Sequence, residues 1–221
     1  MNNNLTELVF ILDRSGSMAG LEADTIGGFN AMIEKQKRET GDAFLSTVLF
    51  SNASTVLYDR VDIRKVEPMT ERQYFVGGCT ALLDAIGDAI HHIGNVHKYA
   101  REEDRPAKTV FVITTDGMEN ASRRYTYDEV RRMVERQRER FGWEFLFLGA
   151  NMDAISAARR FGIREDRAVR YECDAKGTAL NFEVVSETIG CVREGKPLAA
   201  NWKKRIEEDF AERGEHGTVT D

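Results

Sequence analysis

The fold is decided by the stretch Leu8-Val9-Phe10-Ile11-Leu12-Asp13-Arg14-Ser15-Gly16-Ser17, in which five apolar residues lead directly into a turn rich in oxygen side chains. A short apolar run that ends in turn residues is typical of a strand buried on both faces. Such a strand delivers one carboxylate and two hydroxyls to its carboxyl end, where open α/β sheets bind their ligands. Because Mg²⁺ prefers hard oxygen ligands, the turn is a candidate cation site.

Other strands and helices alternate along the rest of the chain. The apolar run at 109–113 repeats the opening plan and leads into Thr114-Thr115-Asp116-Gly117. The predicted strands span residues 8–12, 43–50, 54–59, 109–113, 143–148 and 168–171. Apolar residues at helical spacing predict helices over residues 20–37, 81–93, 130–141, 155–161, 180–193 and 202–210. Thr80 therefore lies at or just before a helix N-terminus.

This order predicts a doubly wound, Rossmann-like α/β sandwich. Strands separated by helices of ten or more residues require crossover connections, which give a mostly parallel sheet with helices on both faces. The strands at 43–50 and 54–59 are joined by a short turn at Ser51-Asn52. We therefore expect a six-stranded sheet with one antiparallel edge strand.

The composition is that of a single globular domain of ordinary size. The chain has 221 residues, of which 42% are hydrophobic. We expect a main domain over residues 1–195, a helical extension packed on it over 196–213, and a flexible tail over 214–221. The 31 basic residues are outnumbered by 37 acidic ones, which gives a net charge of −6. That balance makes nucleic acid an unexpected partner.

Three cysteines and a short N-terminal apolar run predict a reducing, cytoplasmic location. Cys79, Cys173 and Cys191 are odd in number and far apart, so no disulfide framework is indicated. The N-terminal apolar run is only as long as a strand, and no basic segment precedes it. We expect neither a signal peptide nor contact with a membrane.

The oxygen-bearing residues have ordinary explanations when each is taken singly. Ser15 or Ser17 could cap the first helix, Thr80 could cap the helix near Ala81, and Asp116 could belong to a simple turn. The predicted topology brings them together, because the loops after the two apolar strands meet at the switch point of the sheet. Coincidental capping does not predict that convergence, so we favour one shared site.

At this point the sequence resembles the von Willebrand factor A domain with its metal-ion-dependent adhesion site. That motif combines D-x-S-x-S after the first strand, a later threonine, and an aspartate in a T-D-G turn. All three parts are present, as Asp13, Ser15 and Ser17, then Thr80, then Asp116. The resemblance extends from about residue 5 to about residue 193. The phrases at 25–30 and 147–151 are similar to small soluble bacterial or phage proteins of the family, some linked to tellurite-resistance and stress clusters.

The resemblance implies a metal-dependent protein-interaction module. Ser15, Ser17 and Thr80 would supply hydroxyl ligands to Mg²⁺, with Mn²⁺ or Ca²⁺ as alternatives. Asp13 and Asp116 would act largely through metal-bound waters. The expected partner is a protein that offers an Asp or Glu carboxylate to the ion, because three neutral hydroxyls leave its charge under-neutralised. Ligand affinity in the family often changes with a shift of the last helix.

An enzyme is the main alternative, in the form of an Mg²⁺-dependent phosphatase or phosphotransferase that uses Asp13. Aspartyl-phosphate phosphatases carry D-x-D, whereas Ser15 stands at the second position here. A nucleophile elbow, a Walker loop and a G-x-G-x-x-G turn are also missing from the sequence. We therefore predict that the protein is not an enzyme.

Two further clusters, one of histidines and one of arginines, are candidate sites. His91, His92 and His97 do not share the helical spacing of metal ligands, so we expect them at the surface. An anion-binding surface for nucleic acid or an acidic partner would be formed by Arg123, Arg124, Arg131, Arg132, Arg136, Arg138 and Arg140. Acidic residues alternate with these arginines, which favours a solvated helix face. Arg123 and Arg124 follow the Asp116 loop and are retained as a flank for an acidic ligand.

Overall fold

The opening apolar run forms β1 (Asn2–Asp13), a central strand of the sheet. The computed structural model describes residues 2–150 and 153–216. β1 pairs in parallel with β2 (Asp42–Phe50) on one side and with β4 (Pro106–Thr115) on the other. Leu8, Val9, Phe10 and Ile11 are fully buried, as expected for a strand covered on both faces.

The remaining strands complete a sheet with the order β3-β2-β1-β4-β5-β6. β5 (Glu144–Ala150) and β6 (Ala168–Tyr171) continue the parallel pairing beyond β4. β3 (Ser54–Asp62) is the antiparallel edge strand, paired with β2 through the hairpin at 51–53. The predicted fold class is confirmed, with strand ends that differ from the prediction by a few residues.

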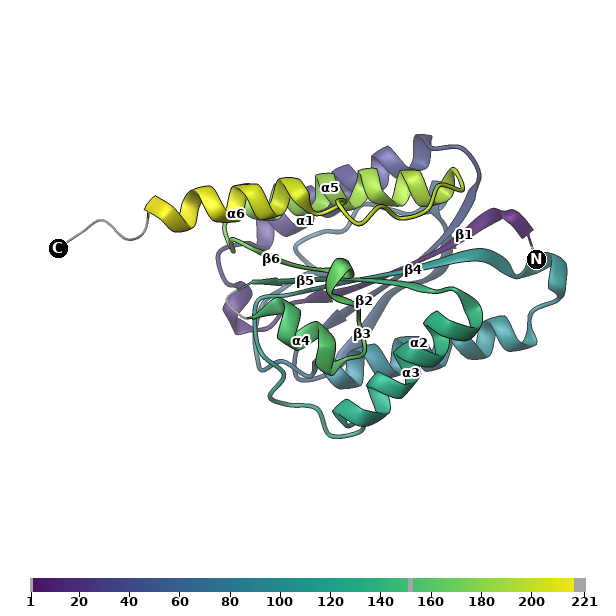
Figure 1. The fold of residues 1–221 in the computed structure, drawn as a ribbon, viewed down its shortest axis with the longest axis horizontal. Coiled ribbons are helices and arrows are strands. Elements are labelled where there is room, and N and C mark those ends of the chain that lie inside the picture. The colour runs from purple at the N-terminus through teal and green to yellow at the C-terminus, as the bar shows by residue number, and fades with distance from the viewer. Residues whose placement is uncertain (1, 151–152, 217–221) are drawn as a thin grey trace.

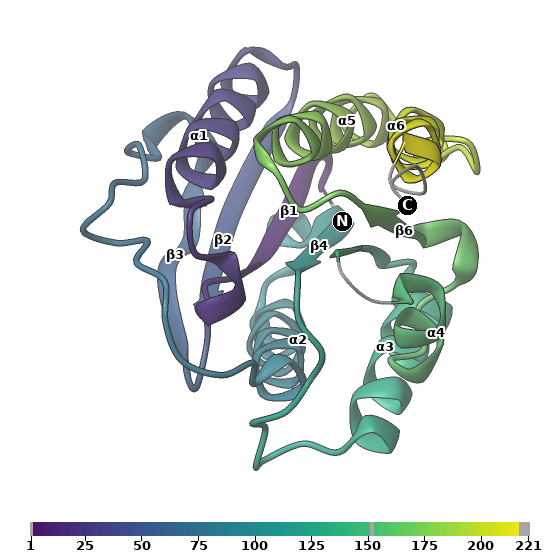
Figure 2. The same ribbon diagram turned by 90° about the vertical axis from the view of Figure 1, so that its left-hand side faces the viewer.

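Helices cover both faces of the sheet, as Figures 1 and 2 show. One face carries α1 (Glu22–Arg38), α5 (Ala175–Arg193) and α6 (Lys204–His216). The other carries α2 (Leu82–Tyr99), α3 (Tyr127–Phe141) and α4 (Ala154–Arg160). Each layer encloses its own hydrophobic cluster against the sheet, so β1 contributes Phe10 to one core and Ile11 to the other. Among the described helices, none is long and apolar enough to cross a membrane.

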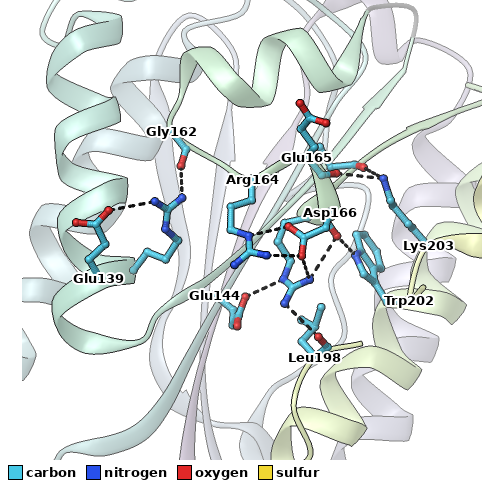
Figure 3. A network of polar contacts seen from close by, with 12 residues as sticks. Glu139, Glu144, Gly162, Arg164, Glu165, Asp166, Leu198, Trp202 and Lys203 are labelled. Carbon is cyan, nitrogen blue, oxygen red and sulfur yellow. Dashed lines mark hydrogen bonds and ion pairs between the residues drawn. The ribbon is translucent and has the colours of Figure 1, made fainter. Parts of the chain in front are cut away.

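The C-terminal extension is fastened to the start of β6 by the polar network in Figure 3. The indole Nε1 of Trp202 donates to the carbonyl of Asp166 over 2.8 Å, and Lys203 Nζ donates to that of Ala168 over 2.8 Å. Ile206 of α6 is buried in the core cluster beneath α5. α6 runs to His216, three residues past the predicted end of the helical extension at 213. Residues 217–221 of the predicted tail lie outside the described residues.

Candidate functional site

The five predicted site residues meet at the carboxyl edge of the sheet. Asp13 is the last residue of β1, and Asp116 follows β4 directly. These two strands are parallel neighbours, with Leu12 opposite Thr114, so their carboxyl ends lie side by side. Ser15 and Ser17 lie on the turn after β1, which includes the short 3-10 helix η1 (Gly16–Met18). Thr80 enters from the loop that precedes α2.

Hydroxyl groups link these segments. The Ser15 and Ser17 Oγ atoms are 3.1 Å apart, and Ser17 Oγ donates a short hydrogen bond to Asp116 Oδ1. A Cβ placed on Gly117 would lie 3.1 Å from Thr80 Oγ1 and 3.5 Å from Ser17 Oγ. Gly117 therefore marks a point at which hydroxyls from two separate loops converge, and its lack of a side chain lets them approach.

Both carboxylate oxygens of Asp13 are occupied by hydrogen bonds. Oδ1 accepts from the Ser15 backbone N–H over 2.7 Å, and Oδ2 accepts from Thr115 Oγ1 over 2.6 Å. The side chain is almost fully buried, with 2% of the residue exposed. Sequence reasoning missed Thr115, although its place in β4 just before Asp116 was a usable signal. Its hydroxyl orients Asp13 across the strand pair.

The loop that carries Thr80 is held against the β1 turn by backbone hydrogen bonds. Gly77 N–H donates to the Arg14 carbonyl over 2.9 Å, and Gly16 N–H donates to the Gly78 carbonyl over 3.0 Å. Tyr74 adds a hydrogen bond of 2.5 Å from its hydroxyl to the Asp13 carbonyl. These contacts join segments more than 60 residues apart, so local sequence patterns gave no signal for them.

A second loop positions Thr80 from the other side. Asn120 Oδ1 accepts from the Thr80 N–H over 2.9 Å, and the Asn120 N–H donates to the Thr80 carbonyl over 3.0 Å. Asn120 thus fixes the backbone of Thr80 relative to the Asp116 loop. It was also missed by sequence reasoning, because an asparagine in a loop is usually a turn residue.

The helix-capping explanation for these hydroxyls does not hold in the described structure. Ser15 precedes η1 without making a side-chain capping bond. α1 begins after Leu21 and α2 after Ala81, and neither residue provides a side-chain cap. Ser17 and Thr80 therefore lie outside the capping positions, and the Ser17 hydroxyl donates its hydrogen bond to Asp116.

The site brings two buried carboxyl groups, those of Asp13 and Asp116, close together. Burial raises the pKa of Asp13, hydrogen bonds from Thr115 and Ser15 oppose that rise, and the nearby charge of Asp116 adds to it. Burial likewise raises the pKa of Asp116 against the hydrogen bond from Ser17. Two carboxylates with raised pKa values are a donor set that a bound cation would stabilise.

Cys173 borders the site from the end of β6. Its Sγ lies 3.8 Å from Asp116 Oδ2. Burial, followed by the charge of Asp116, raises the pKa of the thiol to about 12. The thiol is therefore protonated at neutral pH and does not supply a thiolate. Within the described residues there is no group of three or more His, Cys, Asp or Glu side chains placed to hold a metal ion.

The structure anchors the predicted arginine flank to α2. The carboxylate of Asp84 accepts the backbone N–H groups of both Arg123 and Arg124. The Arg124 guanidinium pairs with Asp88, with a distance of 2.8 Å between Nη1 and Oδ1. Both residues are exposed, and the Arg124 side chain is engaged with α2. Their role as a flank for an acidic ligand stays a prediction.

The surface prediction for the histidines is right for two and wrong for one. His91 and His92 are exposed, and His92 Nε2 lies 2.7 Å from Asp59. His97 is buried, with Nε2 placed 3.2 Å from Glu7 Oε2 and its ring edge-on to Trp143. Glu7 in β1 is fully buried and needs a hydrogen-bond partner in the core. The His97 ring supplies that partner, which accounts for its burial.

Comparisons with known proteins identify the fold. No protein-family model and no curated protein matches the sequence. Among solved structures, proximal thread matrix protein 1 from the mussel byssus, with a zinc-occupied metal-ion-dependent adhesion site, matches at 15% identity with a TM-score of 0.58. The ArnB paralog VWA2 from Sulfolobus acidocaldarius matches at 18% identity and 0.52. A von Willebrand factor type A protein from Catenulispora acidiphila matches at 15% and 0.53.

These matches cover most of this chain but only part of the others. They span 86%, 85% and 83% of this chain, against 47%, 45% and 42% of the respective matched chains. The chain thus corresponds to less than half the length of these three proteins. At such identities the likeness establishes the fold and leaves the activity open. The predicted resemblance is confirmed at that level: this chain has the fold of a von Willebrand factor A domain.

Proposed function

We propose that the protein is a divalent-metal-dependent interaction module that binds an acidic group of a partner protein. The observation that carries the proposal is the convergence of three hydroxyls and two buried carboxylates from separate loops on one edge of the sheet. Ser15, Ser17 and Thr80 would hold the ion directly. Asp13 and Asp116 would orient hydroxyls and waters around it, as outer-shell carboxylates do.

The donor set favours a hard ion and an acidic partner. Mg²⁺ takes oxygen ligands and retains several waters, while Mn²⁺ and Ca²⁺ accept similar donors. The zinc-occupied site of the mussel protein supports a divalent ion at the corresponding edge of this fold. When bound, the ion would supply a positive charge that attracts a carboxylate. An Asp or Glu side chain of the partner would then complete its coordination.

The position of Asp13 favours binding over phosphoryl-transfer chemistry. A nucleophilic aspartate needs an accessible oxygen within reach of substrate. Asp13 is 2% exposed, and each of its oxygens already accepts a hydrogen bond. A screen against p-nitrophenyl phosphate and acyl phosphates in Mg²⁺ tests this point, because turnover that disappears in Asp13→Asn would favour the enzyme.

Metal binding is tested by calorimetric titration of the native chain with Mg²⁺ and Mn²⁺. We expect one equivalent to bind. Thr80→Val removes a ligand hydroxyl, and Gly117→Ala adds a Cβ that crowds the Thr80 hydroxyl. Each substitution should lower metal affinity by about tenfold or more. Asp13→Ala should lower metal affinity by about 10- to 100-fold, with the fold checked by circular dichroism.

Gly77→Ala is the matched control for Gly117→Ala. A Cβ on Gly77 meets nothing within 4 Å, so this variant should bind metal as the native chain does. Equal metal affinity in the native chain and Thr80→Val would show that the Thr80 hydroxyl is not a ligand. Absence of metal binding by the native chain would show that the metal site is wrongly assigned.

The partner is tested by affinity capture from cells with Mg²⁺ or with EDTA. We expect a protein that is retained only in Mg²⁺, and only by chains that bind metal. Replacing candidate Asp and Glu residues of that protein by Asn and Gln should then abolish retention. A partner held equally well in EDTA would contradict the metal-dependent interaction.

A further inference from the structure

A cavity lies between α2 and α3, at the opposite edge of the sheet from the five-residue site. It encloses about 860 Å³, within the range of pockets that hold small organic molecules. Its floor includes Pro106 and Thr109 at the start of β4 and Trp143 just before β5. Thr109, the floor residue nearest to Asp116 along β4, is seven residues before it, a span of about 23 Å along the strand. One small ligand could not occupy both places.

Positive charge dominates this cavity, although the chain as a whole is acidic. Lys98, Arg105, Arg136 and Arg140 line it, and none of its described lining residues is Asp or Glu. Arg136 and Arg140 are one helical turn apart on α3 and form no ion pair within the described part of the chain. The Arg105 Nε is buried and has no hydrogen-bond partner among the described residues, whereas its Nη2 donates to the Ala100 carbonyl over 3.3 Å. The guanidinium groups of Arg136 and Arg140 and the Nε of Arg105 could therefore donate hydrogen bonds to an anion.

The other arginines of α3 each have a partner on the same helix, which for Arg132 is the carbonyl of Asp128, 3.2 Å from its Nε. Arg131 pairs with Glu135 over 2.9 Å, and Arg138 pairs with Glu139 over 3.3 Å, as the prediction of a solvated, salt-bridged helix face requires. Cations in the last turn of a helix can also simply complement its dipole. That explanation covers Lys98 and Arg140 but not Arg136 or Arg105, which lie outside the last turns. The shared feature of all four is the cavity.

The rest of the lining suits an aromatic ring system. Tyr125, Met133 and Phe141 supply apolar and aromatic surface, and Phe141 is 57% exposed although it is large and apolar. Trp143 is 4% exposed and already stacked on Phe111 beneath them. Asn95 and Gln137 place side-chain amides on the facing helices. Amides can both donate and accept hydrogen bonds, as the edge of a heterocyclic base requires.

We propose that this cavity binds a nucleoside polyphosphate. Four cations match the charge of a triphosphate, and arginine is well suited to phosphate oxygens. The aromatic wall would take the base, and the amides of Asn95 and Gln137 would contact its edge. The chain lacks a phosphate-binding glycine loop, so recognition here would depend on side chains.

The test is calorimetric titration of the full chain with ATP and GTP in EDTA, which keeps the metal site out of the measurement. We expect one equivalent of one or both nucleotides to bind, more tightly than inorganic triphosphate or adenosine alone. Arg136→Gln with Arg140→Gln should weaken nucleotide binding by at least about tenfold. Arg131→Gln with Arg132→Gln removes the same charge from the same helix outside the cavity, and should change affinity by less than about twofold.

Four results would overturn the proposal. The first is the absence of nucleotide binding at millimolar concentration, and the second is equal weakening of binding by the two double variants. The third is inorganic triphosphate binding as tightly as the nucleotides. The fourth is displacement of a bound nucleotide by hexaglutamate at a concentration below that of the nucleotide. The last would identify the cavity as a docking groove for an acidic protein segment. Because the titration is made in EDTA, each result is independent of whether the metal site is correctly assigned.

Discussion

The carboxylate of Asp84, on the first turn of α2, organises the loop that follows Asp116. It accepts the backbone N–H groups of Arg123, Arg124 and Tyr125 at distances of 2.9 to 3.0 Å. Burial alone would raise the pKa of Asp84, but these three donors and the Arg124 charge outweigh it and hold the pKa below its ordinary value of 3.8. A single side chain thereby fixes a loop between the site and α3.

We predict that Asp84→Asn lowers the free energy of unfolding by about 1 to 3 kcal/mol at pH 7. Because folding lowers the pKa of Asp84, its ionised form stabilises the fold above the unfolded value of 3.8, and this contribution is lost as the pH falls through the folded value. The difference between native chain and variant should therefore stay constant from pH 7 to 5 and shrink below pH 4. Urea denaturation across this range measures it.

Asp88→Asn is the matched control. Asp88 pairs with Arg124 at the surface, so its loss should change stability by less than about 1 kcal/mol. A gap that widens as the pH falls, or an equal cost for both variants, would show that Asp84 does not act through its ionised carboxylate.

At the scale of the elements, α1 and α5 approach closely because α1 has a glycine, Gly28, where it meets α5. A Cβ on Gly28 would overlap the ring of Phe182 in α5. That ring packs edge-on against Phe29, with centroids 6.4 Å apart, so it has little room to move. Gly27 faces away and meets nothing within 4 Å. Adjacent residues of the same type thus have opposite structural roles.

We predict that alanine at these two positions has effects of opposite sign. Gly28→Ala should destabilise the fold by about 1 to 3 kcal/mol, because it overpacks the contact between the helices. Gly27→Ala should stabilise it by about 0.5 to 1 kcal/mol, because alanine loses less backbone entropy in a helix. Denaturation midpoints of the two variants and the native chain provide the comparison. Destabilisation by both would mean that the helix faces are wrongly assigned.

At the scale of the whole molecule, α6 ties the end of the chain to both β6 and α5. Lys176 at the start of α5 pairs with Asp209 over 2.6 Å, and Arg205 pairs with Glu183 over 3.0 Å. Arg213 pairs with Asp174, the capping residue of α5. Beneath these contacts Ile206 is 2% exposed. Its apolar contact contributes more to stability than the exposed ion pair between Arg205 and Glu183 does.

We predict that Ile206→Ala lowers the free energy of unfolding by about 2 to 4 kcal/mol. For a chain of this size the melting temperature should fall by about 2 to 4 °C per kcal/mol. Metal affinity should be unchanged, because Ile206 lies outside the five-residue site. Glu208→Ala, on the exposed side of α6, should stay within about 0.5 kcal/mol of the native chain. Calorimetry that shows two separate transitions would mean that the extension unfolds independently.

The sequence by itself determined the six strands, the helices between them and the five oxygen-bearing residues of the candidate site. Local sequence patterns predict these features: apolar runs such as Leu8–Leu12, helical spacing of apolar residues, and oxygen-rich turns at strand ends. Together with the rules for crossover connections, such patterns also gave the mostly parallel topology. The site was predictable for the same reason, since each of its parts follows or precedes a recognisable element.

Only the tertiary structure decided which residues support that site and which surfaces lie open. Thr115, Tyr74 and Asn120 act on Asp13 and Thr80 across separations of 40 to 102 residues. The buried His97 contacts Glu7 in the core, and two α3 arginines line a cavity together with residues of α2 and β4. The physical reason is common to all of them: these interactions depend on how distant elements pack, and that packing leaves no periodic trace in any one segment.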